Sequence, residues 1–166
     1  CEPSQWFKKN ANFDNLIWNR FSKIIEDGTN GFPSNWGETL EGNLAKIIVL
    51  DQFSRNVYRN SSKAFEGDSH ALELSLKCIQ ENFLDNAIEP WRHFMLIPMM
   101  HSECIIIQKK SLPLFKKFTN EKVYSYAKKH CNIISRFGRF PHRNKILDRL
   151  STAKEIIFLK KLGSSF

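Results

Sequence analysis

Apolar residues recur every three or four positions along most of the chain, and alternating strand-like patterns are scarce. Between residues 13 and 25, this spacing predicts a first amphipathic helix that ends near Gly28. Its apolar stripe consists of Phe13, Leu16, Ile17, Phe21, Ile24 and Ile25. The stretch "DGTNGFPSNWGET" that follows is rich in Gly, Pro, Asn and Ser, which predicts a loop.

Capping residues and prolines divide the middle of the chain into further helices. We expect Thr39 to cap a second helix that continues into "LDQFSRN". Asp68 is the expected N-cap of a third helix over "DSHALELSLKCIQENF". A fourth helical region starts at Pro90, is expected to be kinked near Pro98, and resumes through "HSECIIIQKK".

Two more helices are predicted after residue 118. Thr119 is expected to open a fifth helix that ends near Phe137, where Gly138 suits a C-terminal cap and Pro141 blocks continuation. A capping-box pattern then introduces a final helix that ends near residue 163. About six or seven helices joined by short loops predict an all-α fold, arranged as a single-domain antiparallel helical array over residues 1–166.

The composition agrees with one folded domain and indicates a class of partner. The 166 residues are 42% hydrophobic and 25% charged, which is typical of a globular chain with a core. The net charge of +8 favours acidic or phosphorylated partners, although much of the excess lies in Lys pairs on separate segments, as solvated helix faces do. The aromatic residues do not alternate with basic ones in an RNA-binding pattern, so we do not expect specific nucleic-acid binding.

Cysteine spacing and hydropathy exclude several other classes. The residues Cys1, Cys78, Cys104 and Cys131 lie far apart without a CxxC motif, which argues against a zinc knuckle or a disulfide framework and favours a reduced, cytoplasmic protein. The longest apolar run, residues 94–100, is far shorter than the roughly 20 residues of a membrane span, so no membrane partner is expected. The chain opens at Cys1 without a Met, which leaves open whether native N-terminal residues are missing.

The first polar constellation lies in "LDQFSRNVYR". Asp51, Arg55 and Arg59 are spaced by four residues, which places them along one face of a helix. Such a ladder of surface ion pairs contributes only a few tenths of a kcal/mol per pair. Gln52 and Asn56 form a second pair four residues apart, and this mixture of donors and acceptors is also suited to recognising a polar ligand.

The second constellation is "MMHSEC", which follows an apolar stretch. His101 or Glu103 is expected to enter a partly buried setting in which its pKa could shift. Two residues apart on a regular helix, they point to nearly opposite sides, which is poor spacing for shared metal ligation. For His101 alone, a satisfied core or surface histidine is an equally good interpretation.

The third constellation, "KKHCNIISRFGRFPHRN", has no acid among residues 136–144. Arg136 closes a helix, where a cation interacts favourably with the C-terminal dipole. Arg139 and Arg143 lie in or beyond the turn, so they need partners from elsewhere. These partners could be Asp148 and Glu155, which would make a basic surface turn, or a bound anion.

Taken in order, these segments resemble a known family. "LAKIIVLDQFSRNVYR", "AFEGDSHAL", "HSE" and "IISRFGRFPHRNKILDRLSTAKE" are similar to the bacterial proteins grouped as domain of unknown function family 924. The resemblance extends from "WFKK" near the start to "FLKK" near the end, and "GRFPHRN" is its most specific motif. Family members usually carry an aromatic "FWF" segment before the point where this chain begins.

The resemblance implies a compact all-α fold classed with the tetratricopeptide-like helical arrays, although no such repeat is visible in this sequence. The activity of the family is unassigned, so the resemblance indicates residues and leaves the chemistry open. The motif positions that it carries over are Asp51, Gln52, Arg55, Asn56, Arg59, His101, Glu103, His130, Arg136, Gly138, Arg139, Pro141, His142, Arg143 and Asn144.

The leading hypothesis is a polar pocket for a small anionic ligand, either a phosphate or a carboxylate compound. The candidate binding residues are Asp51, Gln52, Arg55, Asn56, Arg59, Arg136, Arg139, Arg143 and Asn144. If the pocket is catalytic, His101, His130 and His142 are the candidates for proton transfer, with Glu103 as an orienting carboxylate or base. No metal or cofactor is predicted.

Two alternatives belong to other functional classes. A tetratricopeptide-like interaction module would hold an acidic peptide or a partner protein along successive helices. A metal-dependent hydrolase would use His101, Glu103, His130 and Asp51, and its local spacing makes it the weaker alternative. Arginine and aspartate networks can also serve only to tie helices together.

Overall fold

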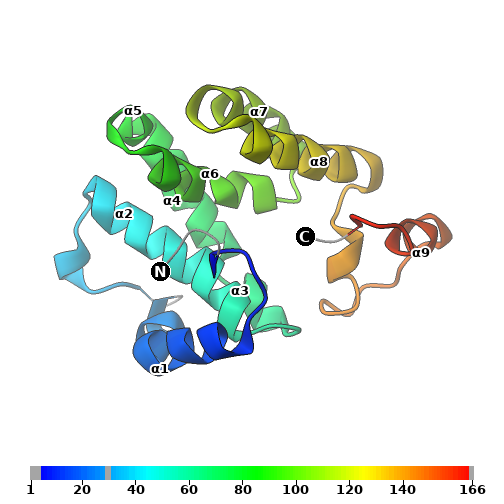
Figure 1. Ribbon diagram of the computed structural model, residues 1–166, viewed down its shortest axis with the longest axis horizontal. Helices are drawn as coiled ribbons and strands as arrows, with labels where there is room; N and C mark the ends of the chain where they lie inside the picture. Colours follow the sequence, from blue (N-terminus) through cyan, green and yellow to red (C-terminus); the bar gives the residue numbers. More distant parts are fainter. Residues whose placement is uncertain (1–4, 29–30, 165–166) are drawn as a thin grey trace. The chain divides into compact units, whose positions relative to one another are not determined.

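The computed structural model describes residues 5–28 and 31–164, and within these ranges it contains helices and no strand (Figure 1). The predicted all-α class is confirmed. The backbone contacts divide the chain into two compact units, Cys1–Phe83 and Leu84–Phe166. The single-domain and tetratricopeptide-like parts of the expectation stay predictions, and Cys1, with the question of the N-terminus, lies outside the described residues.

The N-terminal unit is built from short and medium-length helices, several of which pack around an apolar cluster. Its elements are α1 (Ala11–Gly28), the 3-10 turn η2 (Ser34–Trp36), α2 (Leu40–Ile47), the π-helix η3 (Ile48–Phe53), α3 (Ser54–Val57), the 3-10 turn η4 (Ser62–Phe65) and α4 (Asp68–Gln80). Helix α1 packs against η3 and α3, and α2 packs against α4. Ile17, Ile25 and Val49 form the buried centre, and half-buried aromatic side chains surround it.

Helix α1 follows the predicted stripe with one exception. The Asn10 side chain accepts from the backbone N–H groups of Asn12 and Phe13 at 3.0 and 3.1 Å, so this residue caps the start of the helix. The prediction that Leu16 belongs to the buried stripe is wrong, because 49% of this residue is exposed. It lies beside Ile17, which faces the core, and one residue is a rotation of about 100°.

The second predicted helix begins as expected and then changes geometry. Thr39 caps α2 by accepting from the backbone N–H of Gly42 at 3.1 Å. After Ile47 the backbone widens into the π-helix η3, where the Ser54 hydroxyl donates to the Val49 carbonyl at 3.1 Å. The predicted continuation of the helix into "LDQFSRN" is therefore confirmed, with the geometry of a π-helix over Ile48–Phe53.

Helix α4 forms where predicted but has a different N-cap. The cap position is Gly67, and no side chain makes a capping hydrogen bond there. Asp68 is the first helical residue, and its carboxylate instead contacts the guanidinium of Arg55. Asp68 therefore makes a long-range ion pair with Arg55 and does not cap the helix.

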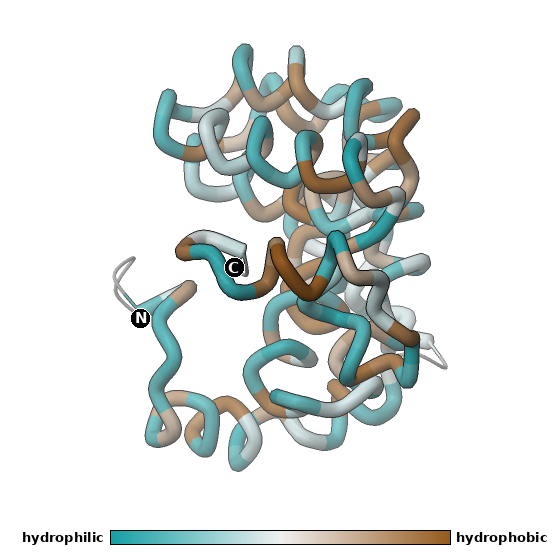
Figure 2. The backbone as a smooth tube through the Cα atoms, turned by 90° about the vertical axis from the view of Figure 1, so that its right-hand side faces the viewer, coloured by the Kyte–Doolittle hydropathy of each residue, from teal (hydrophilic) through white to brown (hydrophobic). Residues whose placement is uncertain are grey.

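The C-terminal unit contains three longer helices and a short final one. Its elements are α6 (Glu89–His101), α7 (Ile105–Phe118), α8 (Glu121–Phe137), the 3-10 turn η5 (Pro141–Arg143) and α9 (Ala153–Leu159), and α5 (Phe83–Asn86) contains the boundary between the units. Helix α7 packs against both α6 and α8. Hydrophobic and hydrophilic residues alternate along the helical turns (Figure 2). Phe115, Ile134 and Phe140 are among the most buried side chains of this unit.

Two helix boundaries in this unit differ from the prediction. Helix α6 is continuous through Pro98 to His101, and the break comes instead between His101 and Ile105. The expected cap of α8, Thr119, closes α7, because its hydroxyl donates to the Phe115 carbonyl at 2.7 Å. The next residue, Asn120, caps α8 by accepting from a backbone N–H.

The two C-terminal signals are confirmed. Gly138 adopts φ 70°, in the left-handed region, and its N–H donates to the Ile134 carbonyl at 2.8 Å. Thr152 and Glu155 form both hydrogen bonds of a capping box at the start of α9. The described residues contain nine α-helical segments, and the two that raise the count above seven, α3 and α5, have four residues each. No helix within residues 5–28 and 31–164 combines the length and apolar character that a membrane span requires.

Gly42 provides a test of how η2 packs on α2. A Cβ atom at this position would lie 1.9 Å from the Trp36 carbonyl oxygen, so Gly42→Ala must displace backbone. In an unconstrained helix this substitution stabilises by about 0.5–1 kcal/mol, whereas here we expect a loss of about 2 kcal/mol. Urea unfolding measures the change, and Glu41→Ala on the exposed side of the same helix is the control, with an expected effect below about 0.5 kcal/mol. A Gly42→Ala protein as stable as the wild type would contradict the packing.

Candidate functional site

The first constellation forms a set of internal bonds within the N-terminal unit. Asp51, on the π-helix η3, is buried, and its carboxylate lies 2.5 Å from the Arg55 guanidinium. Arg55 also contacts the Asp68 carboxylate at 2.8 Å, and the Gln52 amide donates to Asp51 at 2.6 Å. These contacts tie η3 and α3 to the start of α4.

The rest of this constellation bonds to α1. The Arg59 guanidinium donates to both carboxylate oxygens of Asp14, at 2.5 and 2.9 Å, and the Asn56 amide donates to the same carboxylate at 2.7 Å. Burial works to raise the pKa of Asp14, but the hydrogen bonds from Arg59 and Asn56 outweigh it and hold the pKa below its usual value. The predicted ladder therefore ends at Arg55, because α3 stops at Val57 and Arg59 turns towards α1.

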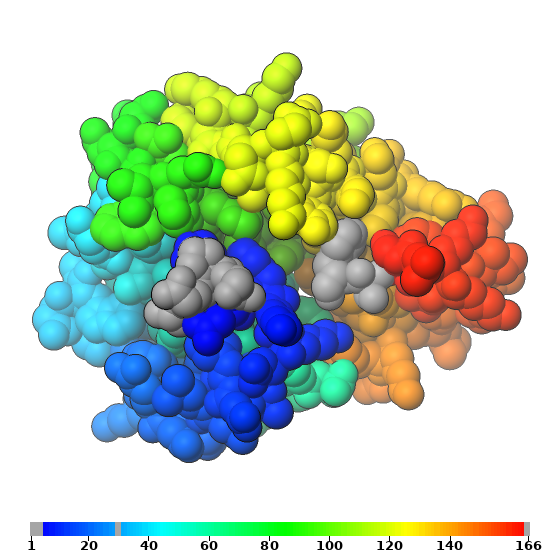
Figure 3. All heavy atoms as spheres, in the orientation of Figure 1, coloured from blue at the N-terminus to red at the C-terminus, as the bar shows by residue number. Residues whose placement is uncertain are grey.

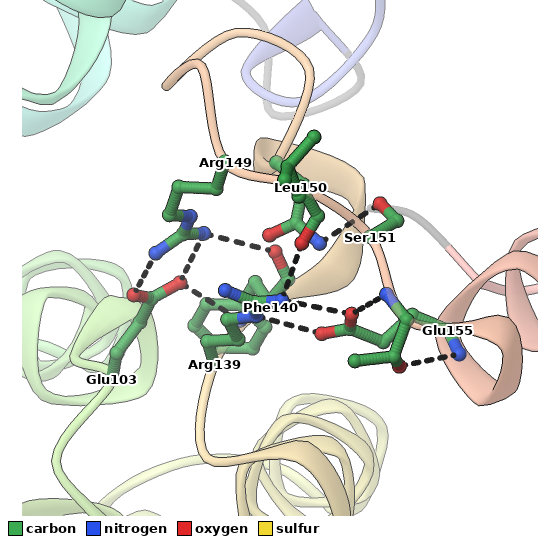
Figure 4. A network of polar contacts seen from close by, with 9 residues as sticks. Glu103, Arg139, Phe140, Arg149, Leu150, Ser151 and Glu155 are labelled. Carbon is green, nitrogen blue, oxygen red and sulfur yellow. Dashed lines mark hydrogen bonds and ion pairs between the residues drawn. The ribbon is translucent and has the colours of Figure 1, made fainter.

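The second and third constellations meet in the C-terminal unit, at Glu103 (Figure 4). The Glu103 carboxylate accepts from the Phe140 backbone N–H at 2.8 Å and from two nitrogens of Arg149 at 2.7 and 3.1 Å. Arg149 also donates to the Phe140 carbonyl at 3.3 Å. Burial works to raise the pKa of Glu103, but the bonds from Arg149 and Phe140 lower it overall. Both carboxylate oxygens are engaged, which favours a positioning role over that of a base.

Arg139 finds one of its predicted internal partners. Its guanidinium donates to both oxygens of Glu155 at 2.7 and 2.9 Å, and to the Leu150 carbonyl at 2.8 Å (Figure 4). The hydrogen bond from Arg139, reinforced by the Thr152 cap, lowers the pKa of the buried Glu155 to about 2. The same carboxylate thus caps α9 and fixes the turn that follows α8.

His130 and His142 contact the ring of Phe140, and His101 lies beside His130; we call His101, His130 and His142 the histidine cluster. The ring centroids of His101 and His130 are 6.1 Å apart, and those of His130 and His142 each lie 5.6 Å from Phe140. The Arg143 guanidinium lies over the same ring at 4.6 Å and donates to the His101 carbonyl at 3.1 Å. The structure therefore brings together three of the four predicted catalytic candidates and one predicted anion-binding arginine.

Two members of the histidine cluster, His130 and His142, favour the neutral form. Burial lowers the pKa of His130 to about 3, and the positive charges of His101 and Arg143 act in the same direction. Burial and the charge of Arg143 lower the pKa of His142 to about 4. His130 Nδ1 lies 2.8 Å from the Tyr126 carbonyl, which can only accept, so this nitrogen carries the proton and Nε2 keeps a lone pair.

Two further candidates take separate positions. Arg136 is exposed on α8, where its guanidinium lies over the rings of Phe137 and Phe158 at 4.8 and 5.9 Å. Asn144 is buried, and its amide donates to the Ser151 hydroxyl at 3.0 Å. The contacts of Arg136 are with two aromatic rings near α9, and Asn144 holds the segment that leads to α9.

Three residues of these polar networks are not predicted from the sequence, namely Asp14, His93 and Arg149. Asp14 is the carboxylate that receives Arg59, and Arg149 is the cation that receives Glu103. Their partners are 45 and 46 residues away, and local sequence patterns do not predict pairs at such separations. His93 is also electrostatically coupled to His101, and burial lowers its pKa to about 4. Its signal was the i, i+8 spacing from His101, which places both on a similar side of α6.

Within the part of the chain that the structure describes, no three His, Cys, Asp or Glu side chains are grouped so that they could hold a metal ion. His101 and His130 are neighbours, but Glu103 is turned towards Arg149 and Phe140. The described geometry gives the metal-dependent alternative no set of ligands.

The helices and the bonded turn after α8 define an all-helical protein whose polar residues are organised by arginine and carboxylate pairs. The model of a family of bacterial proteins of unknown function, DUF924, matches residues 1–163, and the chain belongs to this family. The solved structure of a protein of unknown function from Agrobacterium tumefaciens is similar, with 33% sequence identity and a TM-score of 0.90 over 95% of this chain and 89% of that chain. No curated protein matches the chain.

The lowered histidine pKa values predict a loss of stability in mild acid. His93, His130 and His142 have folded-state pKa values of about 4, 3 and 4, below the ordinary value of 6.5. The unfolded chain therefore binds more protons, so their contribution is complete above pH 6.5 and is lost as the pH falls towards 4. We expect each to cost about 2 kcal/mol by about pH 5, measured by urea unfolding at about pH 7.5 and about pH 5.

Two substitutions distinguish the effect of the buried histidines on the pH dependence of stability from that of other titrating groups. His130→Asn should reduce the difference in unfolding free energy between the two pH values, and His70→Asn, at an exposed position of α4, should leave it unchanged. Equal unfolding free energies of the wild type at both pH values would contradict burial of neutral imidazoles.

The hydrogen bonds of Glu103 lead to a second prediction about stability. Glu103→Gln replaces an oxygen that accepts from Arg149 or Phe140 with an amide that can only donate, so we expect a loss of about 2 kcal/mol in the free energy of unfolding. Glu121→Gln is the matched control, because Glu121 is exposed and lies 3.6 Å from Lys128. Equal small losses in both variants would mean that the Glu103 bonds contribute little.

Proposed function

We propose that the C-terminal unit binds a small anion, a phosphate or a carboxylate compound, at the histidine cluster and Arg143. The observation that carries this proposal is the gathering of His130, His142 and the Arg143 guanidinium at the ring of Phe140, with His101 beside His130. His101 and His142 are half-buried, so the cluster has edges that a small molecule can reach.

The local charge supports an anion over a cation. The charges that act on His130 and His142 include those of Arg143, His101 and Arg149, which are positive, and that of Glu103, which is negative. Arg139 and Glu155 cancel each other in a close pair. The positive groups outnumber the negative one, and the buried Arg143 guanidinium has a planar fork that suits phosphate and carboxylate oxygens.

The predicted binding arginines do not contribute equally to this proposal. Arg55, Arg59 and Arg139 each contact an internal carboxylate, so an external anion would have to displace that carboxylate. Arg143 donates to the His101 carbonyl and lies over the ring of Phe140, next to the imidazoles, so the proposed ligand site is centred on this residue.

The tautomer of His130 gives the cluster a further capacity. Because Nδ1 donates to the Tyr126 carbonyl, Nε2 is a proton acceptor. A bound anion would stabilise the charged imidazoles and raise the pKa of His130 and of His142, so anion binding and proton uptake are coupled. If the bound compound reacts, His130 Nε2 is the group that receives its proton.

Anion binding can be measured at the imidazoles themselves. In NMR spectra of the 15N-labelled protein titrated with phosphate or acetate, we expect the side-chain resonances of His130 and His142 to move together as they take up protons. Arg143→Gln should weaken this binding by about tenfold or more, because it removes the buried charge. Arg136→Gln makes the same charge change at an exposed position and should leave binding unaltered.

The titration of the wild-type protein tests anion binding without any variant. A loss of fold in Arg143→Gln, which circular dichroism would detect, therefore leaves the proposal testable. Imidazole resonances that stay in place with phosphate, acetate and sulfate would refute the proposal. Equal weakening by Arg143→Gln and Arg136→Gln would show a general effect of net charge and would also refute it.

A further inference from the structure

Helices α7 and α8 carry almost the whole net charge of the protein. Helix α7 contains four Lys and no acid, and α8 contains three Lys, one Arg and one Glu. Together they contribute +7, against +8 for the entire chain. The two helices pack against each other in the C-terminal unit, so this charge is concentrated on neighbouring elements.

The spacing of these lysines places them on exposed faces. Within α7 and α8, the lysines recur seven residues apart, which returns to nearly the same side of a helix after two turns, about 10.5 Å along the axis. All of the residues concerned are exposed, and we call them the lysine face: Lys109, Lys110, Lys116, Lys117, Lys122 and Lys129. The residues of α7 and α8 form an outer surface of this unit (Figure 3).

Few acids neutralise the lysine face. Lys117 lies 3.5 Å from Asp85, and both side chains are more than half exposed, which makes a weak pair. For the other five lysines, the structure has no ion pair with any acid among residues 5–28 and 31–164. Such a face attracts polyanions through the release of their counterions.

An aromatic ring lies within the same stripe. Tyr126 follows Lys122 by four residues and precedes Lys129 by three, so it shares their side of α8. It is 42% exposed, and the Lys129 ammonium lies 5.2 Å from its ring centroid. An exposed ring between cations is the arrangement on which the bases of single-stranded nucleic acids stack while their phosphates contact the cations.

An anionic membrane fits this face less well than a nucleic acid. Surface binding to a bilayer gains from apolar side chains that enter the lipid boundary. On α7 and α8 the apolar side is turned inward, as Phe115, Val123 and Ile134 show, and the large hydrophobic residues exposed there are Ile106 and Tyr126. We infer that the lysine face with Tyr126 binds single-stranded nucleic acid through its backbone, without sequence specificity.

Fluorescence anisotropy with labelled oligo(dT) and oligo(U) tests this inference on the full chain. Binding should weaken steeply with salt, with a slope of log K against log salt of about −0.7 for each neutralised phosphate. The combined variant Lys116→Gln, Lys122→Gln and Lys129→Gln should reduce the size of that slope by about 2. The combined variant Lys8→Gln, Lys160→Gln and Lys161→Gln makes the same charge change outside α7 and α8 and should retain most of the slope.

Further measurements test whether bases stack on Tyr126 and whether the lysine face binds a membrane instead. Tyr126→Ala should weaken binding to the oligonucleotides by about tenfold, and Tyr126→Phe, which keeps the ring, should not. Equal losses in the two triple variants, unchanged binding in Tyr126→Ala, or no oligonucleotide binding at low salt would each overturn the inference. Binding to vesicles that contain phosphatidylserine, with none to oligonucleotides, would overturn it in favour of a membrane.

Discussion

The pairing of a guanidinium with a distant carboxylate is the interaction on which the irregular parts of this chain depend. In the C-terminal unit, Glu103 accepts from Arg149 and from the Phe140 backbone, which attaches the turn after α8 to the segment between α6 and α7. In the N-terminal unit, Asp14 accepts from Arg59 and attaches the end of α3 to α1. Both carboxylates are partly withdrawn from water, and each donor offsets part of that cost of desolvation.

These long-range pairs offer a second interpretation of a cluster of arginines in such a sequence. Several cations without a nearby acid suggest an external anion, but the chain can supply the counter-charge from far away in sequence. Only contacts distinguish a structural arginine from one that meets a ligand. By that criterion Arg139 belongs with the structural pairs, whereas Arg143 shares its surroundings with the histidine cluster.

The sequence predicts those features whose causes are local. The stripe of α1, the Thr39 cap, the left-handed Gly138 and the capping box at Thr152 each follow from residues within one or two turns. The π-helix, the role of Asp68 and the position of the break after α6 depend on tertiary contacts, so local rules fail there. The gathering of His101, His130 and His142 also required the fold, because these residues come from the end of α6, from α8 and from η5.

The π-helix between α2 and α3 has a consequence for how this segment tolerates change in length. A π-turn spends about one residue more than an α-turn before returning to the same side, so η3 holds a residue that a regular helix would not need. Loss of one residue here would let the backbone close into an ordinary α-helix, and the residues on either side would keep nearly the same relative orientation. The alignment of Arg55 with Asp68 and of Asn56 with Asp14 should therefore survive a deletion within η3. Loss of one residue from the regular helix α2 would instead rotate the residues after it by about 100° relative to those before it.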